Sequence, residues 1–117
     1  MTGLELAKKA AEILDLKLGV DVKILKVEKI TVITDYFVIV SGQSNTQVSA
    51  LADEVEYQLE QLGVSPTRKE GNPAGGWVVL DYLSVIIHIF HTEAREYYSL
   101  ERLWADAKEI QLKEQEE

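Results

Sequence analysis

Residues 77–90, WVVLDYLSVIIHIF, decide the fold, because they predict two antiparallel strands around a tight turn. We expect strands at 77–82 and 85–90 joined by Leu83 and Ser84, so that Tyr82 pairs with Val85 and sets the register. Side chains alternate between the two faces of a strand. One face is then wholly apolar and is predicted to lie in the core: Val78, Leu80, Tyr82, Val85, Ile87 and Ile89.

The other face of this hairpin, which we call the hairpin patch, mixes several kinds of side chain: Trp77, Val79, Asp81, Ile86, His88 and Phe90. In the predicted register Asp81 lies diagonal to His88, and Trp77 lies opposite Phe90. This mixture is typical of a protein-binding hot spot. The alternative is a helix that covers the patch above a buried pair of Asp81 and His88. The turn lacks Gly, Asn and Asp, so the register depends on an unusual turn.

Two capping boxes predict where helices begin, Thr2 with Glu5 and Ser44 with Gln47. Each is followed by apolar residues at helical spacing, and Gly19 is placed to end the first helix. The acidic side of the second helix is most simply a solvated face. We therefore expect one helix before the first strand and another in the middle of the chain.

The remaining strands are predicted from β-branched and aromatic runs, at 21–28, 36–40 and around 64–69. The run YFVIV at 36–40 has no polar residue, which favours a central strand covered on both faces. Helical sequence resumes near Thr92. The order predicts a single α/β (α+β) domain with a mixed sheet of about five strands and helices packed on it.

Composition bounds the class of protein. The chain has 117 residues, 46% of them hydrophobic and 27% charged, which fits one globular domain with its own core. No apolar run approaches the roughly 18 to 20 residues that span a bilayer, and the start lacks the apolar segment of a signal peptide. We therefore expect a cytoplasmic location. Cysteine is absent, which excludes disulfides and thiolate metal sites.

The net charge of −8 comes from the second part of the chain. Residues 1–40 carry six Lys and six acids, whereas residues 41–117 carry six Lys or Arg against fourteen acids. Such a field repels phosphate backbones and attracts a basic protein at short range. Direct binding to nucleic acid is therefore not expected.

Motifs for catalysis or metal binding are sparse. His88 and His91 lack a third ligand nearby, and SGQS at 41–44 has one glycine, too few for a phosphate-binding fingerprint. Asp35 and Asp81 could join His88 in an acid and base set, yet no Ser or Cys nucleophile lies in a recognisable elbow. We therefore expect no catalytic residue, no cofactor and no metal ion.

Two segments, TDYFVIVSGQSNTQVSALADEV at 34–55 and GGWVVLDYLSVIIHIFHTEAREYYSLERLW at 75–104, resemble the ribosomal silencing factor family, also called Iojap-like proteins. The likeness runs over about the whole chain up to Trp104, and the pattern D-Y-F-V-I-x-S-G followed by W-x-x-L-D-Y is specific. It implies a nucleotidyltransferase-like fold without that superfamily's metal-binding carboxylates. Because the likeness ends at Trp104, we expect a domain over 1–104. Residues 105–117 are polar nearly all round, so we expect a frayed C-terminal tail there. The chain departs from the family at Leu83 and Ser84, where a Gly with an acidic residue is common.

The resemblance implies that the protein binds ribosomal protein L-fourteen of the large subunit, blocks joining of the subunits and represses translation when nutrients are scarce. Some members act in large-subunit maturation, and many are homodimers when free. In this reading Trp77 and Val79 are the buried anchors, and the acids Asp81, Glu93 and Glu101 face the cations of a basic ribosomal protein. The remaining members of the predicted partner-binding set are His88, Tyr98 and Leu100.

Several alternatives stay open. The chain could be a nucleotidyltransferase-like enzyme or a generic acidic dimerisation module. Leu100, Leu103 and Trp104 could only tie the last helix to the sheet, and His88 could only orient Asp81. Arg95 and Arg102 could pair locally with Glu96, Glu101 or Asp106, and exposed pairs of this kind contribute about 0 to 1 kcal/mol.

Overall fold

The computed structural model describes residues 1–98, residue 102 and residues 104–112. Its helices are α1 (Gly3–Leu16), α2 (Asn45–Gln61), the 3-10 turn η1 (Pro73–Gly75) and α3 (Thr92–Tyr98). Its strands are β1 (Val20–Lys26), β2 (Tyr36–Gly42), β3 (Arg68–Asn72), β4 (Trp77–Asp81), β5 (Val85–His91) and β6 (Lys108–Ile110).

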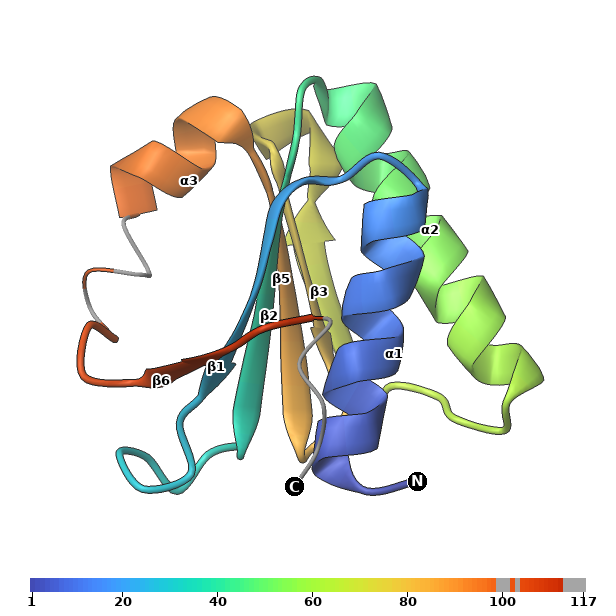
Figure 1. Cartoon of the computed structure of the whole chain (residues 1–117). Helices are drawn as coiled ribbons and strands as arrows, with labels where there is room; N and C mark the ends of the chain where they lie inside the picture. The colour runs from blue at the N-terminus through green and yellow to red at the C-terminus, as the bar shows by residue number, and fades with distance from the viewer. Residues whose placement is uncertain (99–101, 103, 113–117) are drawn as a thin grey trace.

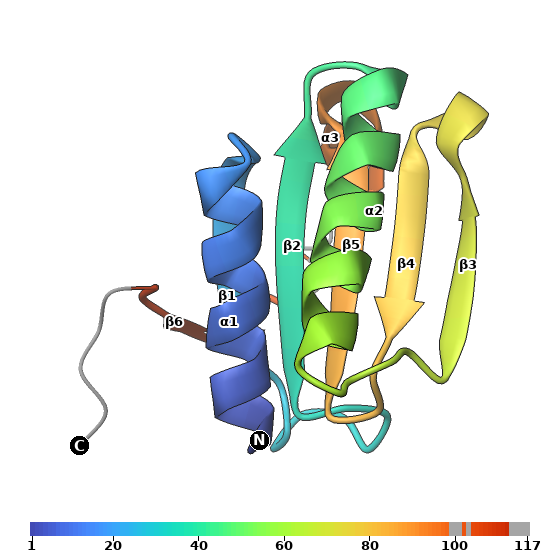
Figure 2. The same cartoon turned by 90° about the vertical axis from the view of Figure 1, so that its right-hand side faces the viewer.

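The strands form one sheet in the order β3-β4-β5-β2-β1-β6. Strands β2 and β5 are parallel, and the other neighbours are antiparallel. Helices α1 and α2 cover one face, while α3 lies at one end of the other, which we call the α3 face (Figure 1). Figure 2 shows α1 and α2 in front of the sheet and α3 behind it. The predicted mixed α/β domain is confirmed, with six strands instead of about five.

Strand β2 is the centre of the core. All seven of its residues are buried, as the unbroken apolar run predicts. The larger core cluster fills the space between the sheet and the helices α1 and α2, and a smaller cluster lies on the α3 face. None of the described helices is long and apolar enough to cross a membrane.

Helix α1 begins as predicted. The Oγ1 of Thr2 accepts a hydrogen bond from Glu5 N at 3.1 Å, and Glu5 Oε1 accepts one from Thr2 N at 2.7 Å, so the capping box is complete. The left-handed residue at its end is Leu18, with φ of 66°, and not Gly19. Gly19 is required for another reason, because a Cβ there would lie 2.6 Å from Cγ2 of Val40.

The second capping box is only half formed. Ser44 Oγ accepts a hydrogen bond from Gln47 N at 3.0 Å, as predicted. The Gln47 side chain does not return this bond, since its Oε1 accepts from Gln43 N and its Nε2 donates to the carbonyl of Leu18 at 3.2 Å. Gln47 therefore ties the start of α2 to the turn that follows α1.

The predicted hairpin register is confirmed. Trp77 pairs with Phe90 and Asp81 pairs with Ile86, and the N–H of Tyr82 donates to the carbonyl of Val85 at 2.8 Å. The face predicted to be apolar lies in the larger core cluster. The unusual turn is achieved by placing Leu83 in the left-handed region, with φ of 73°.

Two strands differ from the prediction. Strand β3 starts at Arg68 instead of near Val64, because Val64 still closes the end of α2 by donating to the carbonyl of Leu59 at 3.0 Å. Strand β6 pairs with β1 inside the stretch expected to be a frayed polar tail. Ile110 is buried there against the larger cluster, and this single apolar contact was too short a signal for a strand.

Leu83→Gly should raise the free energy of unfolding by about 0.5 to 1 kcal/mol, because glycine has no Cβ penalty in the left-handed region. The Leu83 side chain is 64% exposed, so little packing is lost. Urea unfolding should show a higher midpoint with an unchanged slope. Leu83→Ala keeps the Cβ and should show no gain; equal midpoints for the two variants would contradict the strain argument.

Candidate functional site

The hairpin patch lies on the α3 face, because the alternate residues of β4 and β5 face the larger core cluster. Phe90 is 5% exposed, whereas the other five members are half-buried. Hydrogen-bonded strands hold them in place. The structure thus brings together four of the predicted site residues: Trp77, Val79, Asp81 and His88.

The smaller core cluster covers the other half of the α3 face, over β1 and β2. It consists of Leu25, Val27, Phe37 and Ile39, with Ile86, Trp104 and Ala107 packed against it. The rings of Phe37 and Trp104 meet edge to face at 5.1 Å between centroids. Trp104 therefore ties the C-terminal segment to the sheet, which was its alternative role.

Helix α3 does not lie over the hairpin patch in the way the alternative required. It packs on β5 and β2, at the end where both strands finish (Figure 1). The helix covering the patch is thus not found in the described part of the chain. This leaves an amphipathic surface on β4 and β5 beside a covered half on β1 and β2.

His88 sits between two aromatic rings. It meets Phe37 edge to face at 4.9 Å and stacks with Phe90 at 6.1 Å between centroids. Its Nε2 is buried without a hydrogen-bond partner among the described residues. Burial lowers the pKa of His88 to about 4, because the charged ring would lose its hydration. His88 is therefore neutral near pH 7 and adds aromatic area, not charge, to the patch.

The predicted pair of Asp81 and His88 is not formed. Asp81 Oδ1 instead accepts a hydrogen bond from the N–H of Leu83 at 2.8 Å. Asp81 is the last residue of β4, so its carboxylate lies beside the turn that contains Leu83. His88 is opposite Val79, two residues further back along β4. The idea that His88 only orients Asp81 is therefore wrong.

The predicted acids frame the patch at its two ends. Asp81 lies at the turn end, and the exposed Glu93 lies in the first turn of α3, just beyond the end that carries Trp77 and Phe90. Positions 77 and 81 are separated by about 13 Å of strand at roughly 3.3 Å per residue. Tyr98 is the last residue of α3, and Leu100 and Glu101 lie outside the described residues.

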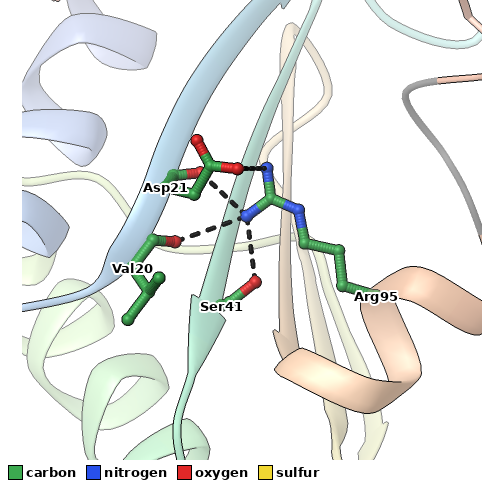
Figure 3. A network of polar contacts seen from close by, with 4 residues as sticks. All are labelled: Val20, Asp21, Ser41 and Arg95. Carbon is green, nitrogen blue, oxygen red and sulfur yellow. Dashed lines mark hydrogen bonds and ion pairs between the residues drawn. The ribbon is translucent and has the colours of Figure 1, made fainter.

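Arg95 is not on the surface, where the possible local ion pair of the sequence analysis would place it. Its side chain is 7% exposed and reaches from α3 to β1 and β2 (Figure 3). Its Nη1 donates to the carbonyls of Asp21 at 2.8 Å and Val20 at 3.3 Å and to Ser41 Oγ at 3.0 Å. Its Nη2 lies 3.5 Å from the Asp21 carboxylate. Backbone carbonyls 74 and 75 residues away leave no signal in the sequence that could have revealed this contact.

A second surface feature is a cavity of about 630 Å³ at the ends of β2 and β5. Its lining includes Asn45, His91 and Glu93 together with residues 74–76. Ends of parallel strands are common ligand sites in α/β proteins. Among the described residues its lining has one carboxylate and no Lys or Arg, so this cavity does not favour a phosphate.

Comparison with known proteins gives one consistent result. A family model described as "Ribosomal silencing factor during starvation" matches residues 2–117. The ribosomal silencing factor of Bacillus subtilis is 40% identical over 100 residues, covering 86% of this chain and 85% of that protein. That of Halalkalibacterium halodurans is 37% identical over 112 residues and covers 96% of each. The crystal structure of a Chromobacterium violaceum protein superposes with a TM-score of 0.85 at 35% identity, covering 90% and 88% of the two chains.

Acidification should destabilise the fold through His88. Its folded pKa is about 4, below the ordinary value of 6.5, so the unfolded chain takes up the proton first. The contribution of the neutral His88 ring to the free energy of unfolding is fully present above pH 6.5 and is lost as the pH falls towards 4. It amounts to at most about 3 kcal/mol.

The measurement is urea unfolding of the wild type and His88→Phe from about pH 7 to 4.5. Carboxylates titrate in both proteins and cancel in the difference. His88→Phe should lose less stability on acidification, and parallel curves would refute the assignment of a buried neutral ring.

Proposed function

Because the chain belongs to the ribosomal silencing factor family, we propose that it binds ribosomal protein L-fourteen on the large subunit and keeps the small subunit from joining. Translation is repressed as a result, above all when nutrients are scarce. The protein acts by occupying a surface in the cytoplasm and catalyses no reaction. Its site is the hairpin patch together with the acids at its ends.

The observation that carries this proposal is the unequal coverage of the α3 face. One half has its own apolar cluster, whereas five of the six residues of the hairpin patch are half-buried, among them Trp77, Val79 and Asp81. Apolar and aromatic anchors inside a polar rim are the usual centre of a protein interface. The strands fix these side chains before binding, so little entropy is lost when a partner docks.

Charge supports a basic partner. The net charge is −8, and the excess of acids lies in residues 41–117, which include the whole patch. Asp81 and Glu93 lie beyond opposite ends of the apolar anchors and would meet Lys or Arg on the partner. Such charges speed association and set orientation more than they raise affinity.

The same patch accounts for a homodimer of the free protein. A half-buried aromatic surface is favourably covered by a second copy when ribosomes are absent, and a twofold interface would place patch against patch. Binding to the ribosome would then compete with dimerisation.

The test of this proposal is co-sedimentation of the purified protein with isolated small and large subunits, followed by a subunit-joining assay on sucrose gradients. Comigration with the large subunit alone and fewer joined ribosomes are expected. Comigration with neither subunit would refute the proposal, and a Mg²⁺-dependent gain in thermal stability with nucleotide would favour the enzyme alternative.

Trp77→Ala should abolish or strongly weaken binding to the large subunit while the chain stays folded, because it removes the largest anchor from a half-buried position. We expect a loss of at least about 2 kcal/mol in binding free energy, measured by titration of isolated large subunits. Tyr57→Ala is the matched control, since Tyr57 is 60% exposed on α2. An unfolded Trp77→Ala would place Trp77 in the core and refute the surface assignment.

Asp81→Asn should slow association with the large subunit and flatten its dependence on salt, because it removes one charge that steers a basic partner. Asparagine keeps the side-chain oxygen that accepts from Leu83 N, so the turn is preserved. Stopped-flow association at several salt concentrations is the measurement. Rates and salt slopes equal to those of the wild type would rule out a role of this carboxylate in steering.

A further inference from the structure

Arg95 binds the backbone at an irregularity in strand β1. The pairing of β1 with β2 shifts register between Val20 and Lys23, and Asp21 within the shift has φ of 53°. The carbonyls of Val20 and Asp21 accept hydrogen bonds from Arg95 Nη1. Figure 3 shows the guanidinium reaching both carbonyls and Ser41 from the far side of β2.

The contact needs an arginine. One guanidinium nitrogen serves the two carbonyls and the Ser41 hydroxyl, and the second faces the Asp21 carboxylate. A planar fork with several fixed donors can satisfy such acceptors together, whereas a lysine offers one compact ammonium group. Because the side chain is 7% exposed and points into the fold, it is not available to a partner.

Arg95 also fixes where α3 leaves the sheet. It lies one turn into α3, which follows β5 without a break. Glu93, at the patch end, precedes it by two residues, and the next described anchor on the α3 face is the contact of Trp104 with Phe37. The direction of α3, together with the hydrogen bond that Glu93 N donates to His91 Nδ1 at 3.2 Å, therefore decides where the Glu93 side chain lies.

We propose that Arg95 is a positioning residue of the ribosome-binding surface, which locks α3 to the irregular start of β1 and so holds Glu93 in line with the hairpin patch. This inference rests on the proposed function. Arg95 would thus affect binding without touching the partner.

The test compares the full-length wild type with Arg95→Gln and Arg95→Lys in titrations of isolated large subunits, well below the unfolding temperature of each variant. Arg95→Gln should weaken binding by about the same factor as Glu93→Gln, because it acts by displacing that carboxylate, with Arg95→Lys in between. Val55→Ala is the matched control, because it destabilises the fully buried packing of α2 on the opposite face.

A double-mutant cycle separates positioning from stability. Glu93→Gln should weaken binding in the wild type and have little further effect in Arg95→Gln, because the carboxylate is then already misplaced. Additive losses would overturn the proposal. The proposal would also be overturned if Arg95→Gln and Val55→Ala, with unfolding temperatures lowered equally, lost the same affinity for the large subunit.

These outcomes are distinct from failure of the proposed function. If the wild type does not bind large subunits, the proposed function itself is wrong, and the inference falls with it. If the wild type binds and Arg95→Gln, still folded, binds equally well, only the inference is wrong.

Discussion

The burial of β2 on both faces is the constraint from which the rest of the fold follows. Its seven residues are all buried, and its two edges are paired with β1 and β5. An apolar strand of this kind needs a layer on each face. Helices α1 and α2 form one layer, and the smaller cluster with Trp104 forms part of the other (Figures 1 and 2). Arg95 then fixes α3 at the end of β2, where the hydroxyl of Ser41 is one of its acceptors.

The two layers are unequal, and this inequality gives the protein its binding surface. On the α3 face the smaller cluster protects β1 and β2, whereas β4 and β5 present the half-buried hairpin patch. The patch is held by the strand ladder, and His88, whose Nε2 is buried, remains neutral within it. A rigid surface of apolar and aromatic anchors with an acid at each end suits recognition of a basic protein better than chemistry on a small substrate.

Local patterns in the sequence predicted most of this arrangement. The capping box at Thr2, the burial of residues 36–40 and the hairpin register were predictable because alternation and capping act over a few residues. The same register correctly grouped Trp77, Val79, Asp81 and His88. The hydrogen bonds of Arg95 to distant carbonyls on β1 were not predictable. The sequence also did not show that Asp81 accepts from the amide of Leu83, two residues away, instead of pairing with His88. Strand β6 was missed because only Ile110 supplies a buried contact there.

Oxidative footprinting of the chain, free and bound to isolated large subunits, tests most directly the claim that the hairpin patch is the contact surface. Trp77 and Tyr57 are oxidisable rings on opposite faces of the sheet, the first in the patch and the second 60% exposed on α2. The account predicts that large subunits protect Trp77 and leave the oxidation of Tyr57 unchanged. Protection of Tyr57 with continued oxidation of Trp77 would place the ribosome on the opposite face and contradict it.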